Sequence, residues 1–94
     1  MNSPHALADE LVSLSAEFSS MSEEIGSIEQ RRPFLWSELR STVKTDKAAD
    51  FEYLKTTDGQ RWIALKHAMA GSEKRQSAIK NMLRVYEQEA RNLH

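Results

Sequence analysis

The chain has 94 residues, with 13 Lys and Arg against 14 Asp and Glu, and it contains no cysteine. This length allows one domain at most. The missing cysteines exclude a disulfide framework and a thiolate metal site. No apolar run approaches the roughly 18 residues of a membrane span, and residues 1–8 lack the basic start and apolar stretch of a secretory signal. We therefore expect a single domain over residues 1–94, located in the cytoplasm and without membrane contact.

The charges are unevenly distributed along the chain. Residues 1–30 carry six acids and no Lys or Arg, whereas residues 59–94 carry seven basic residues and three acids. Such an asymmetry is typical of a protein with an anionic partner. It also fits two helices of one chain that complement each other, and the sequence alone leaves both interpretations open.

The first segment predicts a long helix over residues 4–43. Ser3 supplies a capping hydroxyl, and Pro4 suits the first helical position because its missing N–H is not needed there. Apolar residues then recur in alternating steps of four and three, which is the heptad pattern of a coiled coil. Pro33 predicts a kink, because proline removes a backbone donor. The seam consists of Leu7, Leu11, Leu14, Phe18, Met21, Ile25 and Ile28.

Two further helices are predicted after the first. A short connecting helix over 46–56 follows the capping residue Thr45. A third helix over 58–93 follows Thr57, which is spaced from Gln60 as in a capping box. Its seam again alternates steps of three and four, and it includes two polar positions. The seam consists of Trp62, Leu65, Met69, Ser72, Gln76, Ile79, Leu83, Tyr86, Ala90 and Leu93.

The two seams predict an all-α, antiparallel coiled-coil helical hairpin. With Leu11 and Trp62 at heptad position a, the flanking g positions face each other, and so do the e positions. The charges favour one register and disfavour a slide of one heptad, which would set Arg31 against Arg61 or Arg75. The favoured register predicts the core pairs Leu14–Leu83, Met21–Gln76, Ile28–Met69 and Leu35–Trp62, and the flanking pairs Glu24–Arg75, Glu38–Arg61 and Glu29–Lys66.

Several large apolar residues fall outside the seams and near the predicted bend. Aromatic side chains are common in interface hot spots because each buries a large area with few torsions. We therefore predict a protein-binding surface there, although the same residues would also suit a small core that closes the hairpin. Apolar residues that two helices cannot bury further suggest a homodimer that approaches a four-helix bundle. The candidate interface residues are Phe34, Trp36, Phe51, Tyr53 and Ile63.

A basic run on the last helix offers a second function, binding to DNA or RNA through phosphate contacts. The run consists of Lys74, Arg75, Lys80 and Arg84. The plainer interpretation is that these residues face the acidic first helix or solvate the last one. No stacking aromatic residue is interleaved with them.

No pattern in the chain indicates catalysis. The three histidines, His5, His67 and His94, are scattered, and the three glycines are isolated rather than gathered in a phosphate-binding loop. A thin hairpin also rarely forms the concave pocket that catalysis needs. We expect no enzyme activity, no cofactor and no metal site.

Part of the chain resembles a group of short phage and prophage proteins of uncharacterised function. The resemblance covers residues 36–92 and rests on four segments: Trp-Ser-Glu-Leu-Arg at 36–40, Thr-Asp-Lys at 45–47, Thr-Asp-Gly-Gln at 57–60, and the ending at 83–92. Such proteins are often encoded among early genes for replication and recombination. The resemblance implies an accessory or host-takeover factor in the host cytoplasm. We expect it to bind another protein or, alternatively, to assist recombination on nucleic acid.

Overall fold

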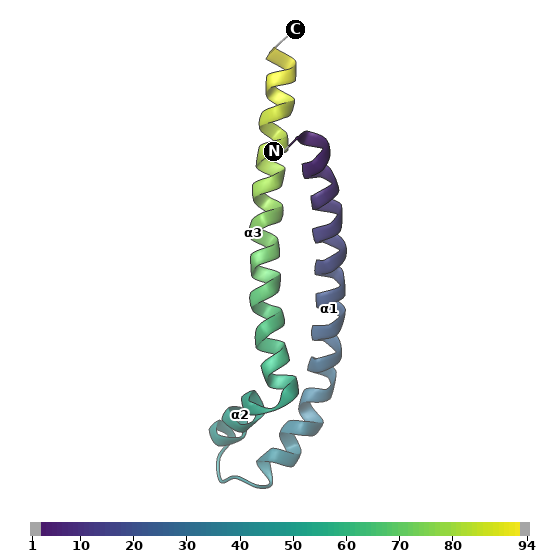
Figure 1. Ribbon diagram of the computed structural model, residues 1–94. Coiled ribbons are helices and arrows are strands. Elements are labelled where there is room, and N and C mark those ends of the chain that lie inside the picture. The colour runs from purple at the N-terminus through teal and green to yellow at the C-terminus, as the bar shows by residue number, and fades with distance from the viewer. Residues whose placement is uncertain (1–2, 93–94) are drawn as a thin grey trace.

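The structure is a computed structural model that describes residues 3–92 of the chain. Three helices, α1 (Pro4–Arg40), α2 (Asp46–Lys55) and α3 (Thr57–Asn92), make up nearly all of it, and this part contains no strand. Helices α1 and α3 run antiparallel side by side, and α2 lies across the bend (Figure 1). The molecule measures 70 × 19 × 19 Å. The prediction of an all-α helical hairpin is therefore confirmed. Over the same residues, no helix is long and apolar enough to cross a membrane.

The first helix ends at Arg40, three residues before the predicted end. Two hydroxyl groups that follow it bond to carbonyl groups of its last turn. Ser41 Oγ donates to the carbonyl O of Glu38 at 2.6 Å, and Thr42 Oγ1 donates to that of Leu39 at 2.7 Å. Pro33 lies inside the helix without breaking it, and the last turns of α1 lean toward α2 in Figure 1. At the other end of the chain, the predicted helix end at 93, the seam position Leu93 and His94 lie outside the described residues.

The caps of the first two helices are those predicted. The Oγ of Ser3 accepts from the backbone N–H of Ala6 at 3.1 Å. Thr45 Oγ1 accepts from that of Ala48 at 3.1 Å. Each hydroxyl satisfies one of the N–H groups that the first helical turn leaves without an internal partner.

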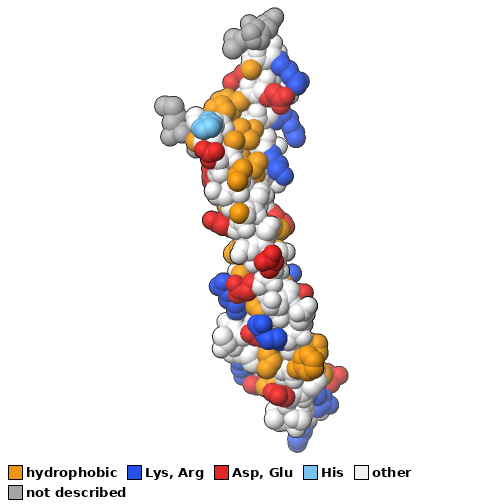
Figure 2. Space-filling model, turned by 90° about the vertical axis from the view of Figure 1, so that its right-hand side faces the viewer, with side chains coloured by type: hydrophobic (Ala, Val, Ile, Leu, Met, Phe, Trp, Pro, Cys, Tyr) orange, Lys and Arg blue, Asp and Glu red, His pale blue; other side chains and the backbone are white. Residues whose placement is uncertain are grey.

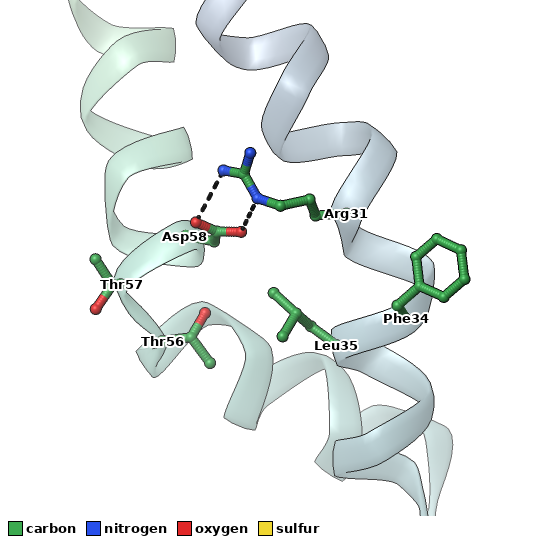
Figure 3. Close-up of a pocket in the computed structure, with 6 residues that line it drawn as sticks. All are labelled: Arg31, Phe34, Leu35, Thr56, Thr57 and Asp58. Carbon is green, nitrogen blue, oxygen red and sulfur yellow. Dashed lines mark hydrogen bonds and ion pairs between the residues drawn. The ribbon is translucent and has the colours of Figure 1, made fainter.

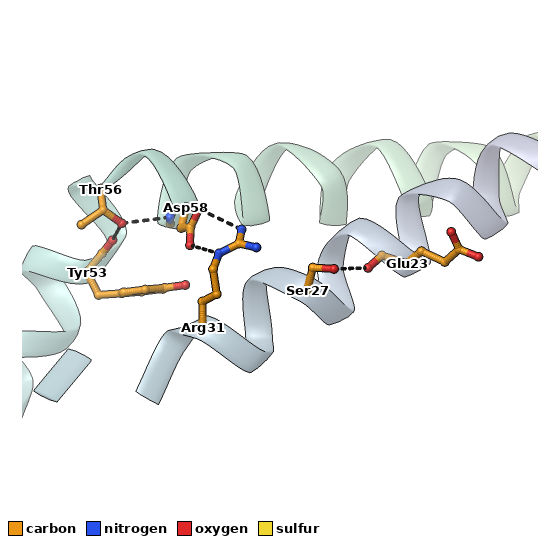
Figure 4. Close-up of polar contacts among 7 residues, drawn as sticks. Glu23, Ser27, Arg31, Tyr53, Thr56 and Asp58 are labelled. Atoms are coloured by element: carbon orange, nitrogen blue, oxygen red, sulfur yellow. Dashed lines mark hydrogen bonds and ion pairs between the residues drawn. The ribbon is translucent and has the colours of Figure 1, made fainter. Parts of the chain in front are cut away.

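The third helix is capped one residue earlier than predicted. Thr56 Oγ1 accepts from the N–H of Gly59 at 3.0 Å and donates to the carbonyl O of Tyr53 at 2.6 Å (Figure 4). Gln60 does not close a capping box with Thr57, because its side-chain amide donates to the carbonyl O of Leu54 at 2.6 Å. Thr56 therefore joins the end of α2 to the start of α3 with a single side chain.

The core follows the predicted seams but is thin. Its central cluster is formed by Ile25, Ile28 and Leu65, which are at most 6% exposed. The half-buried side chains of Met21, Trp62 and Met69 pack around it. Many other seam residues are also only half-buried, because each helix is covered by its partner on one side and is open to solvent on the other. The buried hydrophobic residues of the described chain are Leu7, Ile25, Ile28, Ala49, Tyr53, Leu65 and Ile79.

The register of the two long helices differs from the prediction by about one heptad. Gln76 was expected beside Met21, but its side-chain Oε1 accepts from Ser15 Oγ at 3.5 Å. The predicted core pairs Leu14–Leu83, Ile28–Met69 and Leu35–Trp62 belong to a register that the structure does not adopt. Trp62 instead donates from Nε1 to Glu29 Oε1 at 3.1 Å, six residues before Leu35. As a result, the yellow end of α3 extends past the start of α1 (Figure 1).

The charged pairs that flank the seam also differ from the prediction. Instead of Glu24–Arg75 and Glu38–Arg61, the structure contains Arg75–Glu10 and Arg61–Glu24 contacts. Each is bidentate, with both nitrogen–oxygen distances of 2.8 Å in the first and distances of 2.5 and 2.9 Å in the second. All four residues occupy heptad position g, so we call this side of the hairpin the g flank.

The predicted register was wrong because it treated Arg31 and Arg61 as repelling neighbours. Long guanidinium side chains reach along the helix, and each of these two turns to a different acid. Arg61 binds Glu24, and Arg31 binds Asp58 in the first turn of α3. The observed register also leaves the last turns of α1 free to pack against α2.

Two glycines in α3 predict opposite effects of the same substitution. A Cβ at Gly59 would overlap the carbonyl O of Tyr53 and lie 2.8 Å from the Cα of Leu54, whereas nothing lies within 4 Å of a Cβ at Gly71. Gly59→Ala should therefore destabilise the chain by about 1–3 kcal/mol. Gly71→Ala should stabilise it by about 0.5–1 kcal/mol through helix propensity. Urea denaturation measures both, and equal effects of the two changes would contradict the close packing at Gly59.

The Arg75–Glu10 contact predicts a pH dependence. The hydrogen bond from Arg75 lowers the pKa of Glu10, and burial partly opposes this effect. A carboxyl whose pKa is lower in the folded state stabilises the fold above its unfolded pKa of about 4.3, and this contribution is lost as the pH falls through the folded pKa. In Arg75→Gln, NMR titration should show a raised pKa for Glu10, whereas that of Glu24 should not move. An unchanged midpoint for Glu10 would show that the contact is absent in solution.

Candidate functional site

The bend is built from the last turns of α1, the whole of α2 and the first turn of α3. Two polar contacts fasten α2 to α1. Trp36 Nε1 donates to Asp50 Oδ1 at 2.7 Å, and Arg40 Nε donates to Asp46 Oδ1 at 2.7 Å. Arg40 also donates from Nη1 to the carbonyl O of Val43 at 2.8 Å, inside the turn. These contacts hold the residues of the bend in fixed positions.

Tyr53, one of the predicted interface residues, lies in the core of the bend. Its side chain is fully buried, and the guanidinium of Arg32 lies 4.8 Å from its ring centroid. The phenol oxygen has no hydrogen-bond partner among the described residues. Burial raises the pKa of this phenol above its ordinary value. Tyr53 therefore closes the end of the hairpin and does not present a surface.

The other four predicted interface residues fall into two groups. Trp36 and Ile63 are half-buried. Phe34 and Phe51 are 77% and 62% exposed, which is unusual for phenylalanine in a folded chain. The ammonium of Lys55 lies 4.6 Å from the ring centroid of Phe51. The structure thus separates the five residues into one core residue, two residues with one side covered, and two exposed rings.

An open groove of about 520 Å³ lies beside Phe34, between α1 and the start of α3. Arg31 crosses it from α1 to Asp58, with nitrogen–oxygen distances of 3.0 and 3.2 Å. Figure 3 shows this ion pair inside the groove and the Phe34 ring directed outward at its edge. The remaining lining residues are Leu35, Thr56 and Thr57.

A second open groove, of about 500 Å³, runs along α2 beside Phe51. Its lining residues are Thr45, Lys47, Ala48, Asp50 and Leu54. The two exposed rings therefore each border a shallow groove with a largely apolar floor. Residues 33–60, which form the bend, carry four basic residues and five acids, so the bend is close to neutral.

Sequence reasoning identified the aromatic residues of the bend but missed the groove beside Phe34. The groove depends on Arg31 and Asp58, which were not linked because they are far apart in sequence. Their opposite charges, one shortly before the bend and one shortly after it, were the available signal. Using that signal required the correct register of α1 against α3.

Of the basic run predicted for nucleic-acid contact, one residue lies apart from the other three. Arg75 is held by Glu10 on the g flank. Lys74, Lys80 and Arg84 are exposed, and none makes an ion pair with another residue in the range 3–92. Lys80 and Arg84 are four residues apart and share one face of α3, with Lys74 at the edge of that face. The acids Glu73 and Glu87 lie on the same face.

Comparison with protein-family models, curated proteins and solved structures finds no match for this chain. The geometry of the site is therefore the basis for assigning function. Within residues 3–92, no group of three or more His, Cys, Asp and Glu side chains is placed to hold a metal ion.

The aromatic residues of the bend predict a graded response to substitution. Tyr53→Ala should cost about 3–5 kcal/mol, as for other buried aromatic side chains. Tyr53→Phe should be neutral or slightly stabilising because it removes a buried hydroxyl without a partner. Phe34→Ala should change stability by less than about 0.5 kcal/mol because the ring is exposed. Chemical denaturation tests the series, and a large loss in Phe34→Ala would place that ring in the core.

Proposed function

We propose that this chain is a non-catalytic protein-interaction module that binds its partner with the bend. The observation that supports this function is the exposure of Phe34, a 77% exposed ring at the edge of an apolar groove. Water contact with so much aromatic surface is unfavourable, by about 25 cal/mol per Å² of apolar area. A partner that covers Phe34 would recover this free energy.

The partner that suits the bend is a protein segment with an exposed apolar side chain. The apolar side chain would enter the groove beside Phe34, next to Leu35. Trp36 and Arg40 hold α1 against α2 next to this surface through their contacts with Asp50 and Asp46. The resemblance to phage proteins is consistent with a partner in the host cell.

Binding to nucleic acid receives less support. Arg75 is already neutralised by Glu10, and the acids Glu73 and Glu87 share the face of α3 that carries Lys80 and Arg84. A phosphate backbone binds best to a continuous basic stripe. If nucleic acid were the partner, binding would weaken steeply with salt and would depend on Lys74, Lys80 and Arg84.

The proposed function predicts how substitutions affect capture of a partner. The protein should be immobilised and exposed to lysate from its native host, and captured proteins should be identified by mass spectrometry. Phe34→Asp should reduce capture of the specific partner at least about tenfold, as expected for a hot-spot residue. Val85→Asp is the matched control, because Val85 is 52% exposed but lies near the far end of α3. Equal losses in both variants, or none in Phe34→Asp, would refute binding through the bend.

A further inference from the structure

The outer side of α3 carries a stripe of charges that alternate in sign. Lys66, Glu73, Lys80 and Glu87 are spaced by seven residues and are all exposed. In the heptad pattern, a spacing of seven keeps residues on the same side of the helix. All four occupy position e, and we call this side of the hairpin the e flank.

Helix α1 does not neutralise this stripe. On the g flank its acids bind Arg61 and Arg75, but at its e positions along the stripe α1 presents uncharged residues: Ala8, Ser15 and Ser22. Within residues 3–92, Glu73 and Lys80 make no ion pair. Glu87 pairs with Arg91 in its own helix at 2.8 Å, and Lys66 lies 5.4 Å from the ring centroid of Trp62.

The stripe is complementary to itself when a second copy of α3 runs antiparallel. A two-fold axis near Ser77 places Lys66 opposite Glu87 of the second copy and Glu73 opposite its Lys80. Each contact then occurs twice, as in any two-fold interface. The four contacts extend over about 30 Å of helix at 1.5 Å per residue.

Other alignments of the two stripes are less favourable. A slide of one heptad in either direction sets Glu73 or Lys80 against the same residue of the second copy. A slide of two heptads leaves only two opposite-sign contacts. The charges therefore select a single antiparallel register, in the way that flanking charges select register in coiled coils.

The surface beside the stripe allows a second helix to approach closely. A shallow, open groove of about 520 Å³ lies along this part of α3. Its floor contains the small residues Ala70, Ser77 and Ala78, and its other lining residues are Glu73, Lys74 and Asn81. Small side chains shorten the distance between helix axes, so the charged pairs at the sides come within reach of each other.

Helix α1 fits the same axis. The Ser15–Gln76 contact places this part of α1 level with Ser77. Although α1 is acidic overall, its outward stripe on the e flank, from Ala8 through Val12, Ser15, Ser19 and Ser22 to Gly26, carries no charge. Val12 is 71% exposed on this stripe. Two copies of α1 can therefore meet without repulsion, with Val12 near Ser15 of the second copy.

We propose that two copies of this chain associate face to face through the e flank. In this dimer α3 lies antiparallel on α3, and α1 lies antiparallel on α1, about a two-fold axis near Ser77. Figure 2 shows basic side chains along one edge of the upper half of the molecule, beside a band of hydrophobic side chains. The g flank does not suit this role, because Glu10, Glu17 and Glu24 of α1 would approach the same acids of the second copy. The dimer is independent of the bend surface, which lies at one end of the hairpin.

Charge reversal tests this interface by sedimentation equilibrium. The unaltered chain should form a dimer. Glu73→Lys or Lys80→Glu should each raise the dimer dissociation constant about tenfold or more, because each turns two attractive contacts into repulsive ones. The double variant should restore association. Lys44→Glu, the same charge change in the turn between α1 and α2 and far from the e flank, is the control and should leave the dimer intact. A monomer at all concentrations, or a dimer unaffected by either single change, would overturn the proposal.

A cysteine placed at the axis tests the geometry separately. The chain contains no cysteine, so one introduced thiol gives an unambiguous result. Under oxidising conditions Ser77→Cys should form a disulfide-linked dimer at low protein concentration. Ser20→Cys, which is exposed on α1 away from the e flank, should remain a monomer on a denaturing gel. Efficient linkage through residue 20 but not 77 would place the interface elsewhere.

Discussion

Two bidentate contacts on the g flank set the alignment of the long helices, and the rest of the structure depends on that alignment. Glu10 and Glu24 are separated by two heptads, as are Arg61 and Arg75, so a single register satisfies both pairs. Exposed ion pairs contribute little free energy, about 0–1 kcal/mol each. They matter because they help to select the register of α1 against α3. A heptad seam alone packs almost equally well after a slide of seven residues.

This register has consequences at both ends of the hairpin. At the bend, the last turns of α1 extend beyond the start of α3 and support α2 through Trp36 and Arg40. The same geometry brings Arg31 to Asp58 and forms the groove beside Phe34. At the open end, α3 continues past the start of α1 (Figure 1). The two flanks also differ, because Arg61 and Arg75 on the g flank are paired with acids of α1, whereas the charges at the e positions of α3 face small, uncharged residues.

Local features of the sequence predicted local structure well. The caps at Ser3 and Thr45 and the seam residues Ile25, Ile28 and Leu65 depend on a few neighbouring residues, and the structure places them as expected. The cap of the third helix lies one residue earlier than predicted. Thr56 and Thr57 carry equivalent hydroxyl groups, and only the packing of Gly59 against the end of α2 distinguishes the two positions.

Features that depend on several segments were predicted less well. The register failed because side-chain length lets Arg31 and Arg61 avoid each other, which a pairing of heptad positions does not include. The aromatic residues near the bend were recognised as a group, but their division into buried Tyr53 and exposed Phe34 requires the position of α2 in three dimensions. The charged stripe on α3 was visible in the sequence. Its meaning emerged only once the opposite face of α1 was known to be uncharged.

The alignment of α1 and α3 is the central claim, and methyl NOEs measure it most directly. The observed register places the Leu65 methyl groups in one cluster with Ile25 and Ile28. A sample with labelled methyl groups should therefore show NOEs from Leu65 to both isoleucines, and mixing labelled with unlabelled chains should show that they arise within one chain. The register that is shifted by one heptad would set Leu65 beside Arg32. NOEs from Leu65 to Arg32, without any to Ile25, would contradict this account.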